Sequence, residues 1–136
     1  MGLDDRAIAI TATFTAEALQ PGLAFWAGEL GLEAELRFTG YNQIFQQLLD
    51  PAGIFARNRG GYNVALVRLD DWSAAGPADQ ARRLVDAVRT AASFPAPLIL
   101  AVCPAAGASE LNLAAAEQIV RQGVAGLPTV FPIWPC

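Results

Sequence analysis

A run of β-branched and apolar residues near the amino terminus, Ile8–Thr15 (IAITATFT), predicts a buried β-strand. A helical pattern follows over Pro21–Leu30, so the two segments together indicate the first half of a βαβ unit. In an open α/β sheet, ligands bind in the crevice at the carboxyl ends of the strands. Thr11, Thr13 and Thr15 therefore occupy the place where an active site is expected.

The alternation of strand and helix continues along the rest of the chain. Further strands are expected at 33–39, 63–69, 98–103 and 129–133, separated by helices at about 43–50, 78–93 and 110–123. Strands that alternate with helices favour a parallel sheet with right-handed crossovers. The predicted fold class is therefore α/β: a three-layer sandwich with a five-stranded parallel sheet in the order 2-1-3-4-5.

The spacing of apolar and polar residues assigns local roles within these elements. The first helix is expected to bury one apolar stripe, and the second to begin at a capping Asn42 and bury an apolar face. The stripe comprises Leu23, Trp26, Ala27 and Leu30, and the face comprises Ile44, Phe45, Leu48 and Leu49. Ser109 is expected to cap the last helix, and Arg68, a charge within an apolar strand, to have a local partner.

Residues 1–136 are expected to form one domain. The chain is 54% hydrophobic and 16% charged, which leaves two readings open: a parallel sheet buried on both faces, or an apolar surface meant for a neighbouring domain. No helix is predicted to cover the fifth strand. We therefore expect the chain to belong to a larger protein or to rely on a neighbour for that helix.

The charge pattern argues against nucleic acid and membrane partners. The net charge is −4, and no basic cluster exceeds the pair Arg82-Arg83. The sequence therefore lacks the basic patch that binds the phosphate backbone of a nucleic acid. No apolar run is long enough to span a membrane, and acidic residues precede the first apolar segment. Cys103 and Cys136 form no CxxC pair, as in a reduced compartment. A cytoplasmic location is expected, and the Arg- and Ala-rich composition suggests a bacterial source.

Histidine is absent from the sequence. This absence removes the side chain that most often serves as a general base and as a metal ligand. No Gly-rich loop that would cradle phosphates is present either. Neither a cofactor nor a metal ion is therefore expected.

Three segments carry a family resemblance: Phe14-Thr15 after the first strand, the YNQxFQQLLDP segment at Tyr41–Pro51, and the apolar strand with an acidic-Trp turn at Val64–Trp72. Residues 12–72 resemble the amino-terminal domain of FkbH-type proteins of polyketide and non-ribosomal peptide assembly lines. The resemblance implies an SGNH-hydrolase-like sandwich that precedes a haloacid-dehalogenase-type domain. That second domain loads a glyceryl group onto a carrier protein, but its DxDxT-type motif is absent here, so its magnesium-dependent chemistry is not expected of this chain.

An active SGNH hydrolase has a nucleophilic Ser after the first strand and a late Asp-x-x-His. This chain has threonines there instead, and Thr13 or Thr15 is expected to cap a helix or bond backbone rather than attack a substrate. Asp70 and Asp71 follow the third strand, where they are candidates for a base or Mg²⁺ ligands. Helix capping or an ion pair with Arg68 or Arg57 is the favoured role for these two carboxylates.

The remaining candidates are binding residues at strand ends. Tyr41, Asn42 and Gln43 form a polar cluster that either bonds a pantetheine amide or makes a turn. Cys103 is expected to be structural, since no cation is near it in the sequence. Phe14 is a further binding candidate, and Trp72 is expected to pack or to offer an apolar contact surface, as are Trp134 and Phe131.

These observations favour a non-catalytic accessory, docking or scaffold domain, which positions a carrier-protein-bound intermediate or binds neighbouring synthase domains. The alternative is an acyl or glyceryl transferase, or a thioesterase-like SGNH enzyme, that uses Thr13 or Thr15 with Asp70 or Asp71. A third possibility is a homodimerisation module. Turnover of an ester or thioester distinguishes the enzyme from the two non-catalytic possibilities, and light scattering tests for a homodimer.

Overall fold

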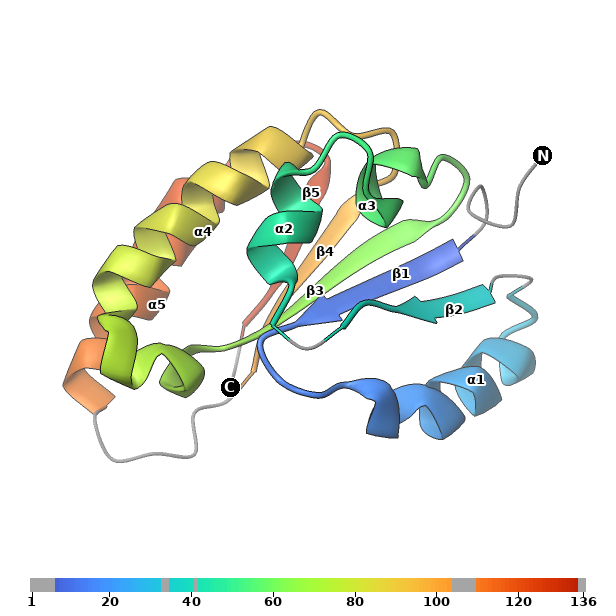
Figure 1. Cartoon of the computed structure of the whole chain (residues 1–136), viewed down its shortest axis with the longest axis horizontal. Helices are drawn as coiled ribbons and strands as arrows, with labels where there is room; N and C mark the ends of the chain where they lie inside the picture. The colour runs from blue at the N-terminus through green and yellow to red at the C-terminus, as the bar shows by residue number, and fades with distance from the viewer. Residues whose placement is uncertain (1–6, 33–34, 41, 104–109, 135–136) are drawn as a thin grey trace.

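The computed structural model describes residues 7–32, 35–40, 42–103 and 110–134, apart from the side chains of residues 73–75 and 110–112. Strands and helices alternate along the chain, with short 3-10 segments after the first and third strands (Figure 1). In order they are β1 (Ala7–Ala12), η2 (Glu17–Leu19), α1 (Gln20–Glu29), β2 (Glu35–Phe38), α2 (Ile44–Leu49), α3 (Ile54–Arg57), β3 (Tyr62–Arg68), η3 (Leu69–Ala75), α4 (Pro77–Ala91), β4 (Leu98–Cys103), α5 (Glu110–Val124) and β5 (Val130–Ile133).

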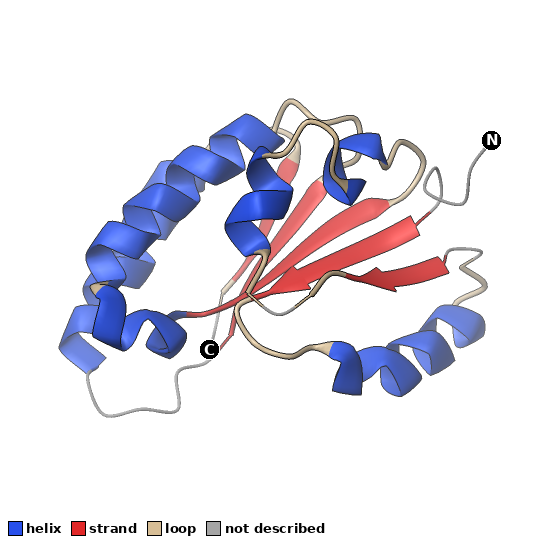
Figure 2. Ribbon diagram, viewed as in Figure 1, coloured by secondary structure: helices blue, strands red, loops and turns tan. Residues whose placement is uncertain are grey.

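The five strands form one parallel sheet in the order β2-β1-β3-β4-β5 (Figure 2). In the centre of the sheet, Ile10 pairs with Val64 and Val64 pairs with Ile99. The predicted α/β class, the parallel sheet and the strand order are confirmed. The order reverses between β1 and β3, because the chain moves one way along the sheet after β1 and the other way after β2.

One face of the sheet carries the main core. Helices α2, α3, α4 and α5 pack on this face, and one contiguous cluster of buried side chains joins them to the strands. The helices contribute Ile44, Leu48, Phe55, Leu84, Val88, Val120 and Val124, and the strands Ala9, Ala65, Val67, Leu98, Leu100, Val102 and Val130. Alternate strand residues point to this face, as the two-residue period of a strand requires.

The opposite face is covered much less. Val64 and Leu66 of β3 and Ile99 of β4, which alternate with the core residues, are half-buried, and Ile133 at the edge is 56% exposed. The crossover from β1 to β2 runs opposite to the later ones, so right-handedness places α1 on this second face. Figure 1 shows α1 apart from the other helices, on the far side of β2.

The prediction that α1 buries an apolar stripe is wrong. No residue of α1 is buried, and Trp26 and Leu30 are 61% and 69% exposed. Phe25, outside the expected stripe, is 60% exposed. Apolar residues lie on all sides of this helix, so no single face is distinguished for packing. Among the described residues, an exposed apolar surface is therefore part of the explanation for the high hydrophobic content.

Several local expectations also need correction. Strand β1 ends at Ala12 instead of Thr15: the Thr13 N–H still donates to the Leu66 carbonyl, but the chain bends at Thr13 and Phe14 and leaves the sheet. Asn42 does not cap α2; Gln43 occupies that position without a side-chain bond, and Asn42 has a positive φ of 55°. Leu49 is exposed rather than core-facing. The expected Ser109 cap lies outside the described residues.

The turn of helix α3 was not predicted. Its four residues sit in a segment expected to be loop, and Phe55 within it is fully buried. Helices α4 and α5 have 15 residues each, and none of the helices in the described part of the chain is long and apolar enough to cross a membrane.

Candidate functional site

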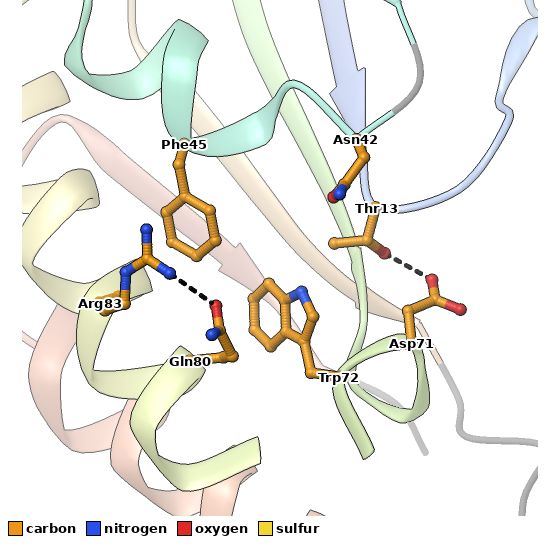
Figure 3. Close-up of a pocket in the computed structure, with 7 residues that line it drawn as sticks. All are labelled: Thr13, Asn42, Phe45, Asp71, Trp72, Gln80 and Arg83. Carbon is orange, nitrogen blue, oxygen red and sulfur yellow. Dashed lines mark hydrogen bonds between the residues drawn. The ribbon is translucent and has the colours of Figure 1, made fainter. Parts of the chain in front are cut away.

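The candidate site is a cavity of about 390 Å³ at the carboxyl edge of the sheet (Figure 3). It opens beside the ends of β1 and β3, where the strand order reverses, which is the usual ligand position in open α/β sheets. The residue after β1, the turn before α2, the first turn of α2, the η3 turn and the first turns of α4 supply its walls. The lining residues are Thr13, Asn42, Phe45, Asp71, Trp72, Gln80 and Arg83.

Thr13 is one of the two threonines considered as a nucleophile, and its hydroxyl both donates and accepts a hydrogen bond. Its backbone N–H donates to the Leu66 carbonyl at 3.1 Å and so continues the ladder between β1 and β3. Its Oγ1 donates to Asp71 Oδ2 at 2.8 Å and accepts from the Arg68 backbone N–H at 3.0 Å. Because the residue is only 2% exposed, the hydroxyl fastens the end of β1 to the turn after β3.

Asp71 is held in turn by Arg68. The guanidinium Nε and Nη2 both donate to one oxygen, Asp71 Oδ1, at 3.0 Å and 2.8 Å, as charge-assisted hydrogen bonds. Asp70 Oδ1 lies 3.8 Å from the same Nε. The hydrogen bond and charge of Asp71 raise the pKa of Arg68 above its ordinary value. The predicted ion pair with Arg68 is confirmed, and Asp71 is the carboxylate that lines the cavity.

The pairing of a Thr hydroxyl with a carboxylate is the geometry that an activated nucleophile needs. Here, however, Asp71 Oδ1 already accepts two N–H groups and Oδ2 accepts the Thr13 hydroxyl. A proton taken up by this carboxylate would weaken its contact with Arg68. The hydroxyl oxygen of Thr13 also accepts a backbone N–H. The arrangement is thus suited to holding the turn in place rather than to proton transfer.

Two aromatic rings and a cation form the opposite wall. Phe45 and Trp72 stack with their ring centres 5.7 Å apart and planes 23° apart. The Arg83 guanidinium lies over the Phe45 ring at 4.5 Å, and its Nη1 donates to Gln80 Oε1 at 3.3 Å. Trp72 is 6% exposed and belongs to the core, so the packing role expected for it is present alongside its place in the cavity.

The other predicted site residues are dispersed around this cavity. Thr11 is buried and accepts a hydrogen bond from the Thr39 hydroxyl at 2.8 Å. Phe14 lies under the Arg68 guanidinium, 5.1 Å from ring centre to cation. Thr15 is exposed and Gln43 half-buried, and neither lines the cavity. Tyr41 lies outside the described residues.

Cys103 has a cationic neighbour that the linear sequence does not reveal. It pairs in register with Arg68 across β3 and β4. Burial raises the pKa of the Cys103 thiol, and the Arg68 charge lowers it by less, so the net direction is upward. A raised pKa leaves less thiolate at neutral pH, which agrees with the expected structural role.

Metal binding finds little support among the described residues. They contain no group of three or more His, Cys, Asp or Glu side chains able to hold an ion. Asp70 and Asp71, the Mg²⁺ candidates, both face the Arg68 guanidinium. A cation placed between them would meet the positive charge that they already surround.

Sequence reasoning missed Phe45, Gln80 and Arg83 as site residues. Phe45 is expected on the apolar face of its helix and is half-buried, whereas Arg83 is exposed and enters the sequence analysis only as part of a short basic pair. The available signal was the three-residue spacing of Gln80 and Arg83, which puts both on one face of α4 next to the η3 turn.

Comparisons with known proteins do not extend this description: no protein-family model matches the chain, and no curated protein or solved structure is significantly similar to it.

Proposed function

We propose that this chain is a non-catalytic binding domain of a cytoplasmic polyketide or non-ribosomal peptide assembly line in a bacterium. In this proposal, the carboxyl edge of its sheet positions an intermediate carried by a carrier protein. The domain itself makes and breaks no bond.

The occupied hydroxyl of Thr13 is the observation that carries the proposal. Thr13 Oγ1 has a carboxylate beside it, but that carboxylate also accepts two side-chain N–H groups of Arg68, and Oγ1 itself accepts the Arg68 backbone N–H. The sequence holds no histidine to replace that carboxylate as a base. The cavity beside it offers hydrogen-bonding groups and aromatic surface, which are features of a binding site.

The family resemblance gives the proposal its context. Two of the three segments that carry the resemblance line the cavity, with Asn42 and Phe45 from one and Asp71 and Trp72 from the other; Thr13, also in the lining, directly precedes the remaining segment. Residues separated by up to 59 positions thus meet at one cavity. A shared binding site is a physical reason for such segments to recur together.

A titration with a carrier protein tests the proposal. The ¹⁵N-labelled domain is followed by NMR as a phosphopantetheine-bearing acyl carrier protein is added, with an unrelated protein of similar size and charge as the control. We expect saturable shifts at the carboxyl edge, for example at Asn42 and Trp72, and none at the amino edge, for example at Arg59. Unchanged spectra at millimolar carrier protein, or shifts confined to the amino edge, would refute the proposal.

One observation favours a second candidate, an acyl or glyceryl transferase. Thr13 Oγ1 and Asp71 Oδ2 are 2.8 Å apart, which is within the reach required of a nucleophile and its base. If a ligand drew Arg68 away from Asp71, the carboxylate would be free to accept the hydroxyl proton. Turnover of an acyl thioester that depends on Thr13 would establish this alternative.

A further inference from the structure

The cavity at the carboxyl edge has a cationic end and an acidic end. Arg83 and Asp71 lie on opposite sides of the stacked rings of Phe45 and Trp72 (Figure 3). A cavity of about 390 Å³ is large enough for a small organic molecule or a segment of a longer one. The distribution of charge therefore fixes the direction in which a polar ligand lies.

Arg83 supplies the cationic end. Within the part of the chain that the structure describes, no carboxylate pairs with it: its recorded partners are the Phe45 ring and the Gln80 amide oxygen. Arg82, the preceding residue on the same helix, is instead paired with Asp79 at 2.9 Å. A guanidinium steadied by a ring and an amide, with its charge unmatched, is suited to bind an oxyanion.

The acidic end accepts hydrogen bonds. Asp71 Oδ1 already receives two N–H groups, whereas Oδ2 receives only the Thr13 hydroxyl. A carboxylate oxygen has two acceptor positions, so Oδ2 retains one for a ligand hydroxyl or amide N–H. Figure 3 shows the Asn42 amide directed into the space beside Thr13, where it can serve a ligand amide as donor or acceptor.

The middle of the cavity is apolar. The stacked rings of Phe45 and Trp72 lie between the two polar ends, and neither ring carries a charge. A ligand segment that crosses them gains from burying methyl or methylene groups. The complementary molecule thus has an oxyanion, then a short apolar segment, then a hydroxyl or amide.

We propose that this cavity binds a ligand in which an oxyanion is joined through a short apolar segment to a hydroxyl or amide. In the setting of the proposed function, this ligand is the phosphopantetheine arm of the carrier protein. The phosphate lies at Arg83. The dimethyl-substituted carbon that follows it packs on Phe45 and Trp72. The adjacent hydroxyl donates to Asp71 Oδ2, and the first amide bonds Asn42. This inference rests on the proposed function for its source of ligand, but its chemistry is testable without any carrier protein.

Binding of free 4′-phosphopantetheine tests the inference. Isothermal titration calorimetry compares it with pantetheine, which lacks the phosphate, and with inorganic phosphate. We expect phosphopantetheine to bind about tenfold or more tightly than either. In NMR spectra, the Trp72 indole N–H should shift with phosphopantetheine, while the indole signals of Trp26 and Trp134 stay in place.

Two arginines on one helix provide matched variants. Arg83→Gln should lower the affinity for phosphopantetheine to that of pantetheine, whereas Arg82→Gln should leave it within twofold of the unsubstituted chain. Asn42→Ala, at an exposed position, should weaken both pantetheine compounds without changing their ratio. Circular dichroism confirms that each variant is folded.

Equal affinity for phosphopantetheine and pantetheine, or equal losses in the two arginine variants, would overturn the inference. So would binding of inorganic phosphate as tight as that of phosphopantetheine. If a carrier protein binds the carboxyl edge but free phosphopantetheine does not, this inference alone fails. If phosphopantetheine binds and no carrier protein does, the ligand chemistry stands and the proposed function fails.

Discussion

At the scale of single residues, Thr13, Asp71 and Arg68 form a connected set of hydrogen bonds at the carboxyl edge of the sheet. Arg68 was recognised as a charge that needs a partner, and the structure gives it Asp71 as that partner. The partner of Thr13 was not predictable, because Thr13 and Asp71 are 58 residues apart. Spacing in the sequence constrains neighbours on one helix or strand, whereas this contact depends on the register between β1 and β3.

The buried hydroxyl of Thr13 should contribute measurably to stability. Thr13→Val keeps the shape of the side chain but leaves the Arg68 N–H and Asp71 Oδ2 without their partner, so we expect the free energy of unfolding to fall by about 1–3 kcal/mol. Thr13→Ser preserves both bonds and should lose less. Urea unfolding followed by circular dichroism measures the difference, and equal stability of the Val variant and the unsubstituted chain would contradict the assigned bonds.

Cys103 should react slowly with alkylating reagents. Burial raises its pKa, so the thiolate fraction at pH 7–8 is lower than in a free cysteine and grows only at higher pH. Arg68→Gln removes a charge that lowers this pKa and should shift the reaction to still higher pH. Mass spectrometry of the Cys103 peptide after timed exposure to iodoacetamide gives the rate, and alkylation at pH 7 as fast as that of free cysteine would rule out a raised pKa.

At the scale of elements, predictions succeeded where one periodicity was strong and buried. Strand β4 was predicted with its observed bounds, Leu98–Cys103, because its apolar run is bounded by Pro97. Helix α4, expected at about 78–93, spans Pro77–Ala91 and buries one face that includes Ala81 and Leu84. Helix α1 has comparable apolar content but packs little, and the one-turn α3 is too short to produce a periodic signal.

Close packing of α4 against α5 predicts opposite effects for two helical glycines. A Cβ on Gly123 would lie 2.5 Å from both methyl groups of Val85, whereas a Cβ on Gly28 of α1 would meet nothing within 4 Å. Gly123→Ala should therefore cost about 1–3 kcal/mol of unfolding free energy, while Gly28→Ala should be neutral or stabilise by up to about 1 kcal/mol.

Thermal and urea unfolding of the two glycine variants measures this contrast. In a Val85→Ala background, Gly123→Ala should no longer destabilise the chain and should restore part of the stability that Val85→Ala loses, because the methyl groups that clash with the added Cβ are gone. Destabilisation of both single variants to the same extent would show that helix–helix contact is not the cause.

At the scale of the whole molecule, the second face of the sheet is the most unusual feature. Phe131 and Ile133 on β5 are more than half exposed, as are Phe25 and Trp26 of α1. Large exposed apolar areas are typical of contact surfaces. This arrangement favours the expectation of a neighbouring domain or a second copy, although neither is required for the site at the carboxyl edge.

An apolar dye should detect this face directly. We expect the folded chain to enhance the fluorescence of anilinonaphthalene sulfonate, and the double variant Phe131→Glu, Ile133→Glu to reduce that enhancement by roughly half. Light scattering on the same samples reports whether self-association falls in parallel. Arg59→Glu, at an exposed position away from β5, controls for added negative charge, and dye binding that is unchanged by the β5 substitutions would exclude this face as its site.

The central claim is that the Thr13 hydroxyl is structural and the cavity beside it binds without catalysing. Its most direct test is the hydrolysis of p-nitrophenyl acetate and of acetyl-pantetheine by the unsubstituted chain, Thr13→Val and Thr13→Ser. The account predicts rates equal to those of buffer alone for all three proteins. Turnover by the unsubstituted chain that persists in Thr13→Ser and disappears in a folded Thr13→Val would contradict it.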